Sequence, residues 1–188
     1  MLEVLKSRRS IYNLSKNIDL SEDEIIRIVE DTTRYVPDAF DMKSQRVVLA
    51  LGDKHDELWE KIYDAFDGKL SREKIDGYKA AYGTVLYFMD ENVIKSLQEQ
   101  FDIYADNFPI WANQSNGMLQ YAIWTAFTKH NIGANIQHYN PVIDEAVKKL
   151  FNLPENYKLV AQMPFGKIEA IPTEKTQEDI TERVKIVK

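Results

Sequence analysis

The segment 117–127 is apolar at nearly every position, with Gln120 and Thr125 as its polar interruptions. A helix that is apolar on all sides has to be buried on all sides. At roughly 14 residues this helix is too short to cross a bilayer, which needs about 20. We therefore expect it to be the central helix of a soluble core. It should end near residues 129–132, with Gly133 in the left-handed conformation that caps many helices.

The segment 134–141, ANIQHYNP, follows this helix and is rich in side chains that form hydrogen bonds. We call it the exit segment. Polar groups held by a rigid buried element are typical of ligand sites, so we expect a ligand to bind here. At its end, Asn140 and Pro141 are suited to cap and begin a helix over 142–151.

Composition narrows the function classes. At 188 residues the chain can bury a sizeable core, and we expect a single domain over residues 1–188. Lysine and arginine total 24 against 30 acidic residues, a net charge of -6, which argues against a general nucleic-acid binder.

The absence of cysteine excludes disulfides, thiolate catalysis and cysteine-ligated zinc. The histidines lack metal-type spacing, so we expect no metal. With no apolar run of spanning length and no signal-peptide core, we expect a cytoplasmic protein without a membrane partner.

The remaining periodicity predicts an α+β fold, because helices and strands follow one another without strict βαβ alternation. Ser21 and Glu24 form a capping box that opens an amphipathic helix with Ile25, Ile28 and Val29 on one face. Further helices are expected at 2–7, 53–66, 71–82 and 92–101, and buried strands at 47–51, 84–89 and 159–165.

The last residues, 183–188, alternate between basic and apolar side chains. Alternation is typical of a half-buried strand. No partner strand is near in sequence, so this segment is expected to complete a sheet elsewhere, including in another subunit. A frayed tail is the alternative.

Two polar segments are candidates for ligand binding. Arg8, Arg9 and Ser10 can bind a phosphate through charge-assisted hydrogen bonds, although a solvated basic turn fits the same residues. The loop 37–46 leads into the strand at 47–51, a place where sites are common, but an ordinary connection fits it equally well.

Three runs of the sequence are long enough to be specific: FPIWANQSNGMLQYAIWTAF, NIGANIQHYNPVID and KLVAQMPFGKIEAIPTEK. They closely resemble the flavin-dependent nitroreductase family, in its branch related to the yeast fatty-acid-repression-mutant protein. With residues 7–10 and 37–46, the resemblance covers essentially the whole chain in order.

The resemblance implies a mixed β-sheet flanked by helices and an interlocked homodimer, with FMN at the subunit interface and a C-terminal arm over the partner. It also implies which residues bind FMN. The phosphate and ribityl chain would contact Arg8, Arg9 and Ser10, with Lys175 or Arg183 completing the phosphate site and Gly166 close by. The ribityl chain and pyrimidine edge would lie along Asp38, Ala39, Phe40, Asp41 and Lys43, and the isoalloxazine would lie against Ile136, Gln137 and His138.

The loop departs from the family pattern. Where relatives have a sequence close to PSAFNSQS, this chain has PDAFDMKS. An ionised Asp41 only accepts hydrogen bonds, for example from flavin N3–H. A lysine at position 43 near flavin N1 and O2 would stabilise the reduced anion, and Asp41 would offset part of that effect.

The reaction implied is a two-step hydride transfer, in which NAD(P)H reduces FMN at N5 and a nitroaromatic or quinone is then reduced. The cofactor carries this chemistry, so no catalytic side chain is assigned. His138 fits either a proton donor or a structural or stacking role, and Phe108, Trp111 and Tyr139 fit either the substrate side or the core. A competing interpretation is a flavin-binding sensor in lipid or stress regulation with incidental reductase activity. A third is a flavin-free scaffold.

Overall fold

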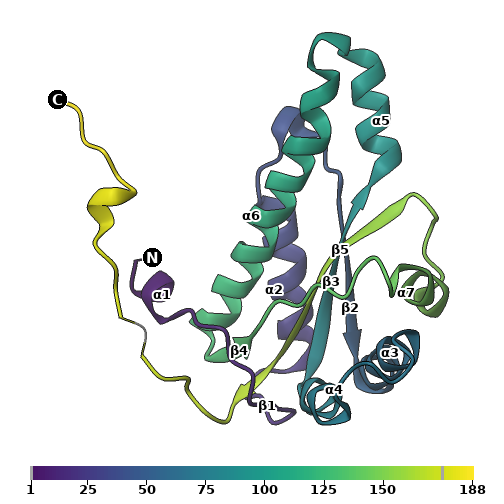
Figure 1. Ribbon diagram of the computed structural model, residues 1–188, viewed down its shortest axis with the longest axis vertical. Helices are drawn as coiled ribbons and strands as arrows, with labels where there is room; N and C mark the ends of the chain where they lie inside the picture. The colour runs from purple at the N-terminus through teal and green to yellow at the C-terminus, as the bar shows by residue number, and fades with distance from the viewer. Residues whose placement is uncertain (1, 175) are drawn as a thin grey trace.

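A single antiparallel sheet forms the centre of the molecule. The computed structural model describes residues 2–174 and 176–188. The strand order is β1-β5-β3-β2, and β4 also pairs with β5 (Figure 1). A parallel pairing occurs at the bridge between Ser10 and Ala134. Helices together with this antiparallel sheet confirm the predicted α+β class. The sheet counts as mixed because of this single parallel bridge among the described residues. The strands are β1 (Leu14–Ser15), β2 (Gln45–Leu51), β3 (Gly83–Asp90), β4 (Ile132–Ala134) and β5 (Tyr157–Ile168).

Helices cover both faces of this sheet. On one face α2 and α6 pack against Val85 and Tyr87 of β3, and on the other α3, α4 and α7 pack against Leu86 and Phe88. Because side chains of a strand alternate between faces, the eight buried residues of β3 contribute to both layers. The helices are α1 (Leu2–Ser7), α2 (Glu22–Tyr35), α3 (Gly52–Ala65), α4 (Arg72–Lys79), α5 (Glu91–Gln100), α6 (Phe108–Lys129) and α7 (Asp144–Phe151), with short 3-10 turns η1 (Ala39–Asp41), η2 (Asp102–Asn107) and η3 (Ile180–Glu182).

The capping box of α2 forms as its sequence predicts. The Ser21 hydroxyl accepts a hydrogen bond from the Glu24 backbone N–H at 3.4 Å, and the Glu24 carboxylate accepts one from Ser21 N–H at 2.8 Å. Ile25 and Val29 are buried on the face toward the sheet. The prediction for the Asn140–Pro141 pair was wrong: residues 140–143 form a turn, and α7 begins at Asp144.

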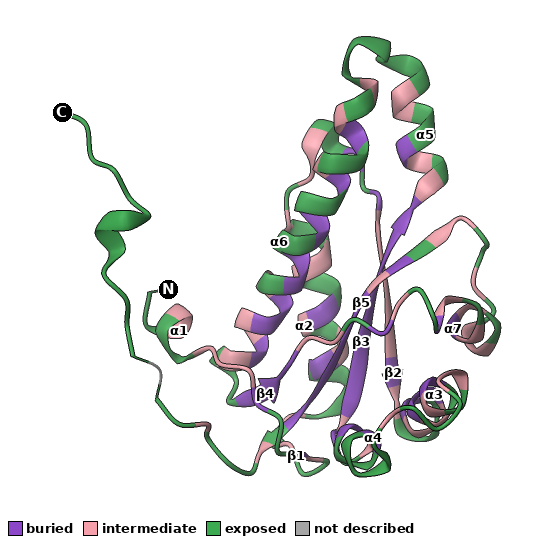
Figure 2. Cartoon of the chain, in the orientation of Figure 1, coloured by how far each residue is buried: buried purple, intermediate pink, exposed green. Residues whose placement is uncertain are grey.

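The central helix α6 differs from expectation in two ways. It is not buried on all sides, because Met118 and Tyr121 remain 46% and 43% exposed while the opposite face is buried (Figure 2). At its end the left-handed residue is Asn131, with φ 58°, not Gly133. Gly133 lies in β4, where an added Cβ would come within 2.8 Å of the Leu14 side chain. The outer face of α6 is therefore exposed and apolar around Met118 and Tyr121, and the Arg8 guanidinium lies 5.8 Å from the centre of the Tyr121 ring.

The C-terminal arm, residues 176–188, leaves the body of the molecule (Figure 1) and is exposed throughout. Residues 183–188 form no strand in the single chain, so the predicted half-buried strand is absent there. A strand needs a partner, and within the described part of the chain residues 183–188 pair with no strand. None of the described helices is long and apolar enough to cross a membrane.

Candidate functional site

The exit segment has a free backbone edge at residues 136–138 within the described part of the chain, whereas its first residue, Ala134, pairs with Ser10 and Ile11. Gln137 N–H donates to the Gln162 carbonyl at 2.7 Å, and Gln162 N–H donates back to Gln137 at 3.0 Å. Along an antiparallel strand, the residues before and after a hydrogen-bonded residue direct their backbone N–H and C=O groups away from the partner strand. The backbone groups of Ile136 and His138 are therefore directed outward. The side chain of Gln137 donates to Asn135 Oδ1 at 2.7 Å, and Asn135 in turn donates to the Ile11 carbonyl at 2.7 Å, which fixes the segment.

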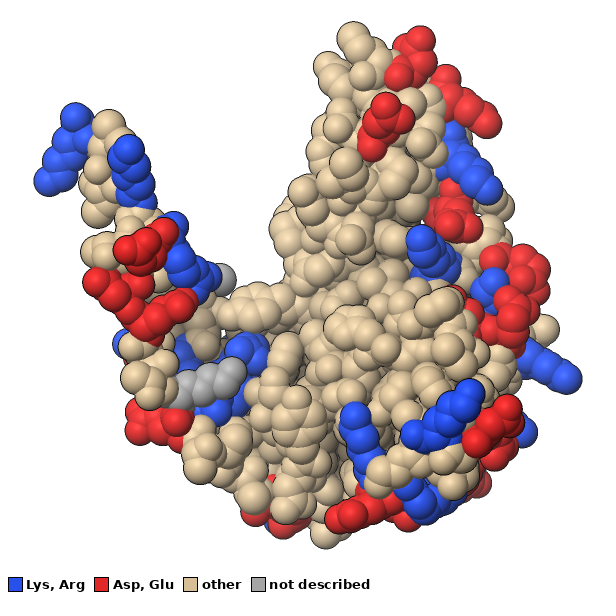
Figure 3. Space-filling model, in the orientation of Figure 1, with Lys and Arg blue, Asp and Glu red and all other residues tan. Residues whose placement is uncertain are grey.

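Arg8, Arg9 and Ser10 line a cavity of about 1100 Å3, which we call the phosphate-end cavity. The Arg8 guanidinium lies over the Trp124 ring, 4.2 Å from its centre, and its buried Nε has no hydrogen-bond partner among the described residues. Arg9 donates to the Thr173 carbonyl at 2.9 Å. Figure 3 shows positive side chains gathered where the arm leaves the body. Arg8 is thus held by an aromatic ring while a donor remains available for an anion.

Two further cavities border the exit segment. Tyr12 lines both the phosphate-end cavity and a neighbouring cavity of about 400 Å3, the Gln137 cavity, which Lys74 also lines. His138, the next residue along, lines a third cavity of about 660 Å3, the His138 cavity. The Gln137 and His138 cavities share no lining residue, and adjacent positions of the exit segment border them. We call the line of residues from Arg8 to His138 that borders the three cavities the track.

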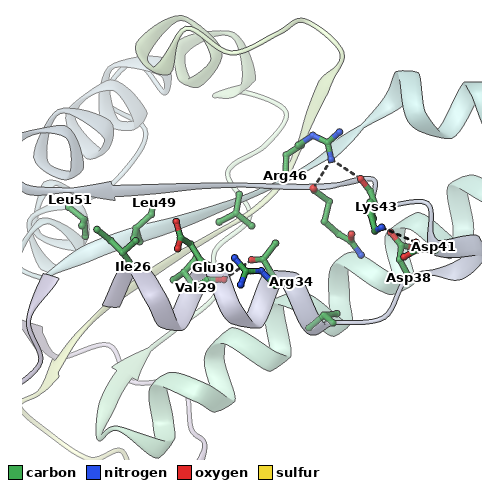
Figure 4. Close-up of a pocket in the computed structure, with 14 residues that line it drawn as sticks. Ile26, Val29, Glu30, Arg34, Asp38, Asp41, Lys43, Arg46, Leu49 and Leu51 are labelled. Carbon is green, nitrogen blue, oxygen red and sulfur yellow. Dashed lines mark hydrogen bonds and ion pairs between the residues drawn. The ribbon is translucent and has the colours of Figure 1, made fainter. Parts of the chain in front are cut away.

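The predicted loop residues lie elsewhere. Asp38, Asp41 and Lys43 line a separate cavity of about 770 Å3 between α2 and β2 (Figure 4). The strand β2 that follows the loop is one edge of the sheet and the exit segment lies at the other, and none of the residues 38–43 is among those that line the three cavities of the track. The ammonium of Lys43 forms an exposed ion pair with the Asp41 carboxylate at 2.9 Å. In the single chain these two side chains, which the sequence suggested would have opposite effects on the flavin, therefore pair with each other.

The neighbours of the loop are aromatic. Phe40, in η1 with Ala39, has φ 56° and stacks on Trp111, with 5.6 Å between ring centres. Phe108, which also contacts Phe40, is fully buried, and Tyr139 is buried against Trp59. Phe108 and Tyr139 are therefore core residues. Trp111 instead stacks against Phe40, which is exposed.

The remaining predicted residues are not brought to the track. Gly166 is buried in β5, where an added Cβ would lie 2.5 Å from the Ser15 carbonyl oxygen, so close packing explains this glycine. Arg183 forms an ion pair with Glu178 at 2.6 Å within the arm. Lys175 lies outside the described residues.

Sequence reasoning missed Tyr12 and Lys74. Tyr12 follows Ser10 by two positions, so the motif itself carried a signal for it. Lys74 lies on a short helix far away in sequence, and its ammonium is 5.9 Å from the centre of the Tyr78 ring. Burial, helped by the nearby Tyr139, raises the pKa of Tyr78 well above its ordinary value, so this phenol stays neutral. Among the described residues no His, Asp and Glu side chains cluster as a metal site would require.

The sequence model of the nitroreductase family matches residues 5–167. The chain belongs to the nitroreductase family. Nitroreductase FRM2 of Saccharomyces cerevisiae is 32% identical over 178 residues, which cover 93% of this chain and 91% of FRM2. The solved structure of nitroreductase CinD from Lactococcus lactis in complex with chloramphenicol has a TM-score of 0.95 and 43% identity, covering 100% of this chain and 99% of CinD. The predicted branch is confirmed, and family membership makes this nitroreductase an oxidoreductase.

A more distant structure shares the fold. A putative nitroreductase from Exiguobacterium sibiricum, solved in complex with FMN, has a TM-score of 0.73 and 15% identity, covering 99% of this chain and 96% of that one.

Proposed function

We propose that this nitroreductase is an FMN-dependent NAD(P)H oxidoreductase that reduces nitroaromatics or quinones. Each chain would form one FMN-binding domain, and two chains would form a homodimer with FMN at their interface. The track from Arg8 to His138 carries the proposal, because it joins a cationic end suited to a phosphate with a free strand edge suited to a polar ring.

The residues of the track fit FMN. The unpartnered Nε of Arg8 is a buried donor, which is costly unless an anion satisfies it. At the other end, the outward backbone groups beside Gln137 offer donors and acceptors to the polar edge of the ring. Bound FMN would supply the hydride-transfer chemistry, and this chain would bind and orient it.

Three surfaces support the homodimer. The strip of α6 around Met118 and Tyr121 is exposed and apolar. The strand β2 has a free edge beside the cavity that Val47 and Leu49 line. The arm carries the alternating residues 183–188, which pair with no strand among the residues that the structure describes. We propose that the arm of each chain pairs with β2 of the other, which buries the alternating apolar side chains.

Exchange between subunits also accounts for the divided site. The loop 38–43 lines a cavity of its own and none of the cavities of the track, so the loop of one subunit would complete the track of its partner. The ligands of related structures support this site: a relative with 15% identity was solved with FMN, and CinD was solved with chloramphenicol and with 4-nitrophenol, both small aromatics.

The test is an anaerobic titration of the purified protein, loaded with FMN, by NADH and by NADPH, followed by addition of a nitroaromatic. The proposal predicts that one of the two nucleotides bleaches the flavin and that the acceptor restores its colour over repeated turnovers. A protein that binds flavin but turns over barely above background would favour the sensor interpretation. A protein that retains no flavin contradicts the proposal.

A further inference from the structure

The His138 cavity has a chemistry that the flavin track does not require. It lies between α5, α6 and the end of the exit segment, and its volume of about 660 Å3 is typical of small-molecule sites. Met89, Ile94 and Leu159 line it, and each of them is buried. This apolar floor suits the face of an aromatic ring.

One wall of the cavity carries an oriented amide. Asn116 Nδ2 donates to the Phe88 carbonyl of β3 at 3.0 Å, and Gln120 Nε2 donates to Asn116 Oδ1 at 2.8 Å. Both side chains are buried, and Gln120 lines the cavity. The relay therefore holds the Gln120 side chain in one orientation from the backbone of the central strand.

The charged lining is predominantly positive. Two lysines, Lys95 of α5 and Lys158 of β5, line the cavity, and Glu91 is the one acidic residue among its lining residues. Neither lysine takes part in an ion pair within the described part of the chain. Asp144, whose charge interacts with that of Lys158, lies outside the lining. A ligand in this cavity would thus meet two cationic groups above an apolar floor.

We propose that the His138 cavity binds an anionic aromatic acceptor, with the ring on the apolar floor and a carboxylate or similar anion near Lys95 and Lys158. The inference rests on the proposed function, since His138 is shared with the flavin track and places this ligand beside the ring. It adds a substrate class: aromatic acceptors that carry a negative charge are preferred over neutral ones of equal shape. Lys95 and Lys158 are the specificity-determining residues.

The experiment compares para-nitrobenzoate with para-nitrobenzamide, a neutral molecule of nearly the same shape. Isothermal titration calorimetry on the FMN-loaded protein measures both affinities in the wild type, in Lys95→Gln and in Lys158→Gln. The control is Lys149→Gln, an exposed lysine of α7 that does not line the cavity. We expect tighter binding of the benzoate, a loss of about fivefold for each lining lysine, and no change in the benzamide or the control. Added salt should reduce the preference because both lysines reach solvent.

Equal affinity for the two ligands, or an equal loss in the control, overturns the inference. Flavin content, measured by absorbance on the same samples, separates the two proposals. A flavin-loaded protein without a charge preference refutes the anionic acceptor and leaves the proposed function standing. A flavin-free protein that still prefers the benzoate refutes the proposed function and supports the anion site.

Discussion

The guanidinium carbon of Arg8 lies 4.2 Å from the centre of the Trp124 ring. This contact joins the N-terminal motif to α6, the helix that also carries the exposed strip around Tyr121. A cation held over an aromatic face is fixed in position without losing its hydrogen-bond donors. The core of the molecule thus positions the group that is proposed to bind phosphate.

Replacing Arg8 by Ala should weaken FMN binding by about ten- to a hundredfold, because a hydrogen bond to a charged group contributes roughly 1.5 to 3 kcal/mol. Fluorescence titration of the apoprotein with FMN measures the change. Arg27→Ala, an exposed arginine on α2, is the matched control and should bind FMN as the wild type does. Unchanged affinity in Arg8→Ala would remove the phosphate assignment.

Deleting residues 181–188 should shift the protein from dimer toward monomer, because the apolar side chains of the arm would no longer be buried against β2. Sedimentation velocity over a concentration series measures the shift. A sharper version replaces Val184 and Ile186 by Asp, with Lys185→Gln as the control on the other face. Truncated protein that still sediments as a tight dimer would refute arm exchange.

A buried histidine should make stability depend on pH. Burial lowers the pKa of His55 from 6.5 to about 4. Its Nδ1 lies 3.0 Å from the Thr84 hydroxyl, which also accepts a hydrogen bond from Trp59 Nε1 at 2.9 Å. The hydroxyl proton is therefore free to be donated to Nδ1, which is consistent with a neutral imidazole.

Between pH 6.5 and 4 the unfolded chain binds a proton at His55 that the folded chain does not. The free energy of unfolding should accordingly fall as pH decreases through this window, by up to about 3 kcal/mol, and His55 should add no further slope above or below it. Urea unfolding across this range should show a flatter dependence in His55→Gln and an unchanged one in His130→Gln, which alters an exposed histidine. Identical slopes in His55→Gln and the wild type would contradict the buried neutral state.

Gly166→Ala should destabilise the fold by about 1 to 3 kcal/mol or more, because the added Cβ would meet the Ser15 carbonyl and the Tyr82 backbone nitrogen, neither of which can move freely. Gly77→Ala, in α4 with open space around it, is the control and should be neutral or stabilising. Thermal unfolding distinguishes the two. A Gly166→Ala protein of wild-type stability that has lost FMN would restore the cofactor role for this glycine.

Local patterns in the sequence predicted the helices and strands because capping and periodicity are decided within one segment. The capping box at Ser21 and the apolar run of β3 needed no knowledge of the rest of the chain. The outer face of α6 was misjudged, because Met118 and Tyr121 are as apolar as the buried face and composition does not say which side has a partner.

The site was less accessible to sequence reasoning. The residues from Arg8 to Ser10 and from Ile136 to His138 carry specific motifs, and the fold brings them onto one track. The loop 38–43 belongs to the opposite edge of the sheet, a separation that depends on strand order. Lys74, Lys95 and Lys158 escaped notice because solvated lysines on helices and strand ends look alike until tertiary structure places a cavity beside them.

The central claim is that two copies of this chain hold FMN along the track from Arg8 to His138. Size-exclusion chromatography of FMN-reconstituted protein, with absorbance recorded for protein and flavin together, tests it most directly. We predict that the visible flavin band elutes with a dimer at one FMN per chain. A colourless protein peak, with all the flavin eluting as free FMN, would contradict the claim.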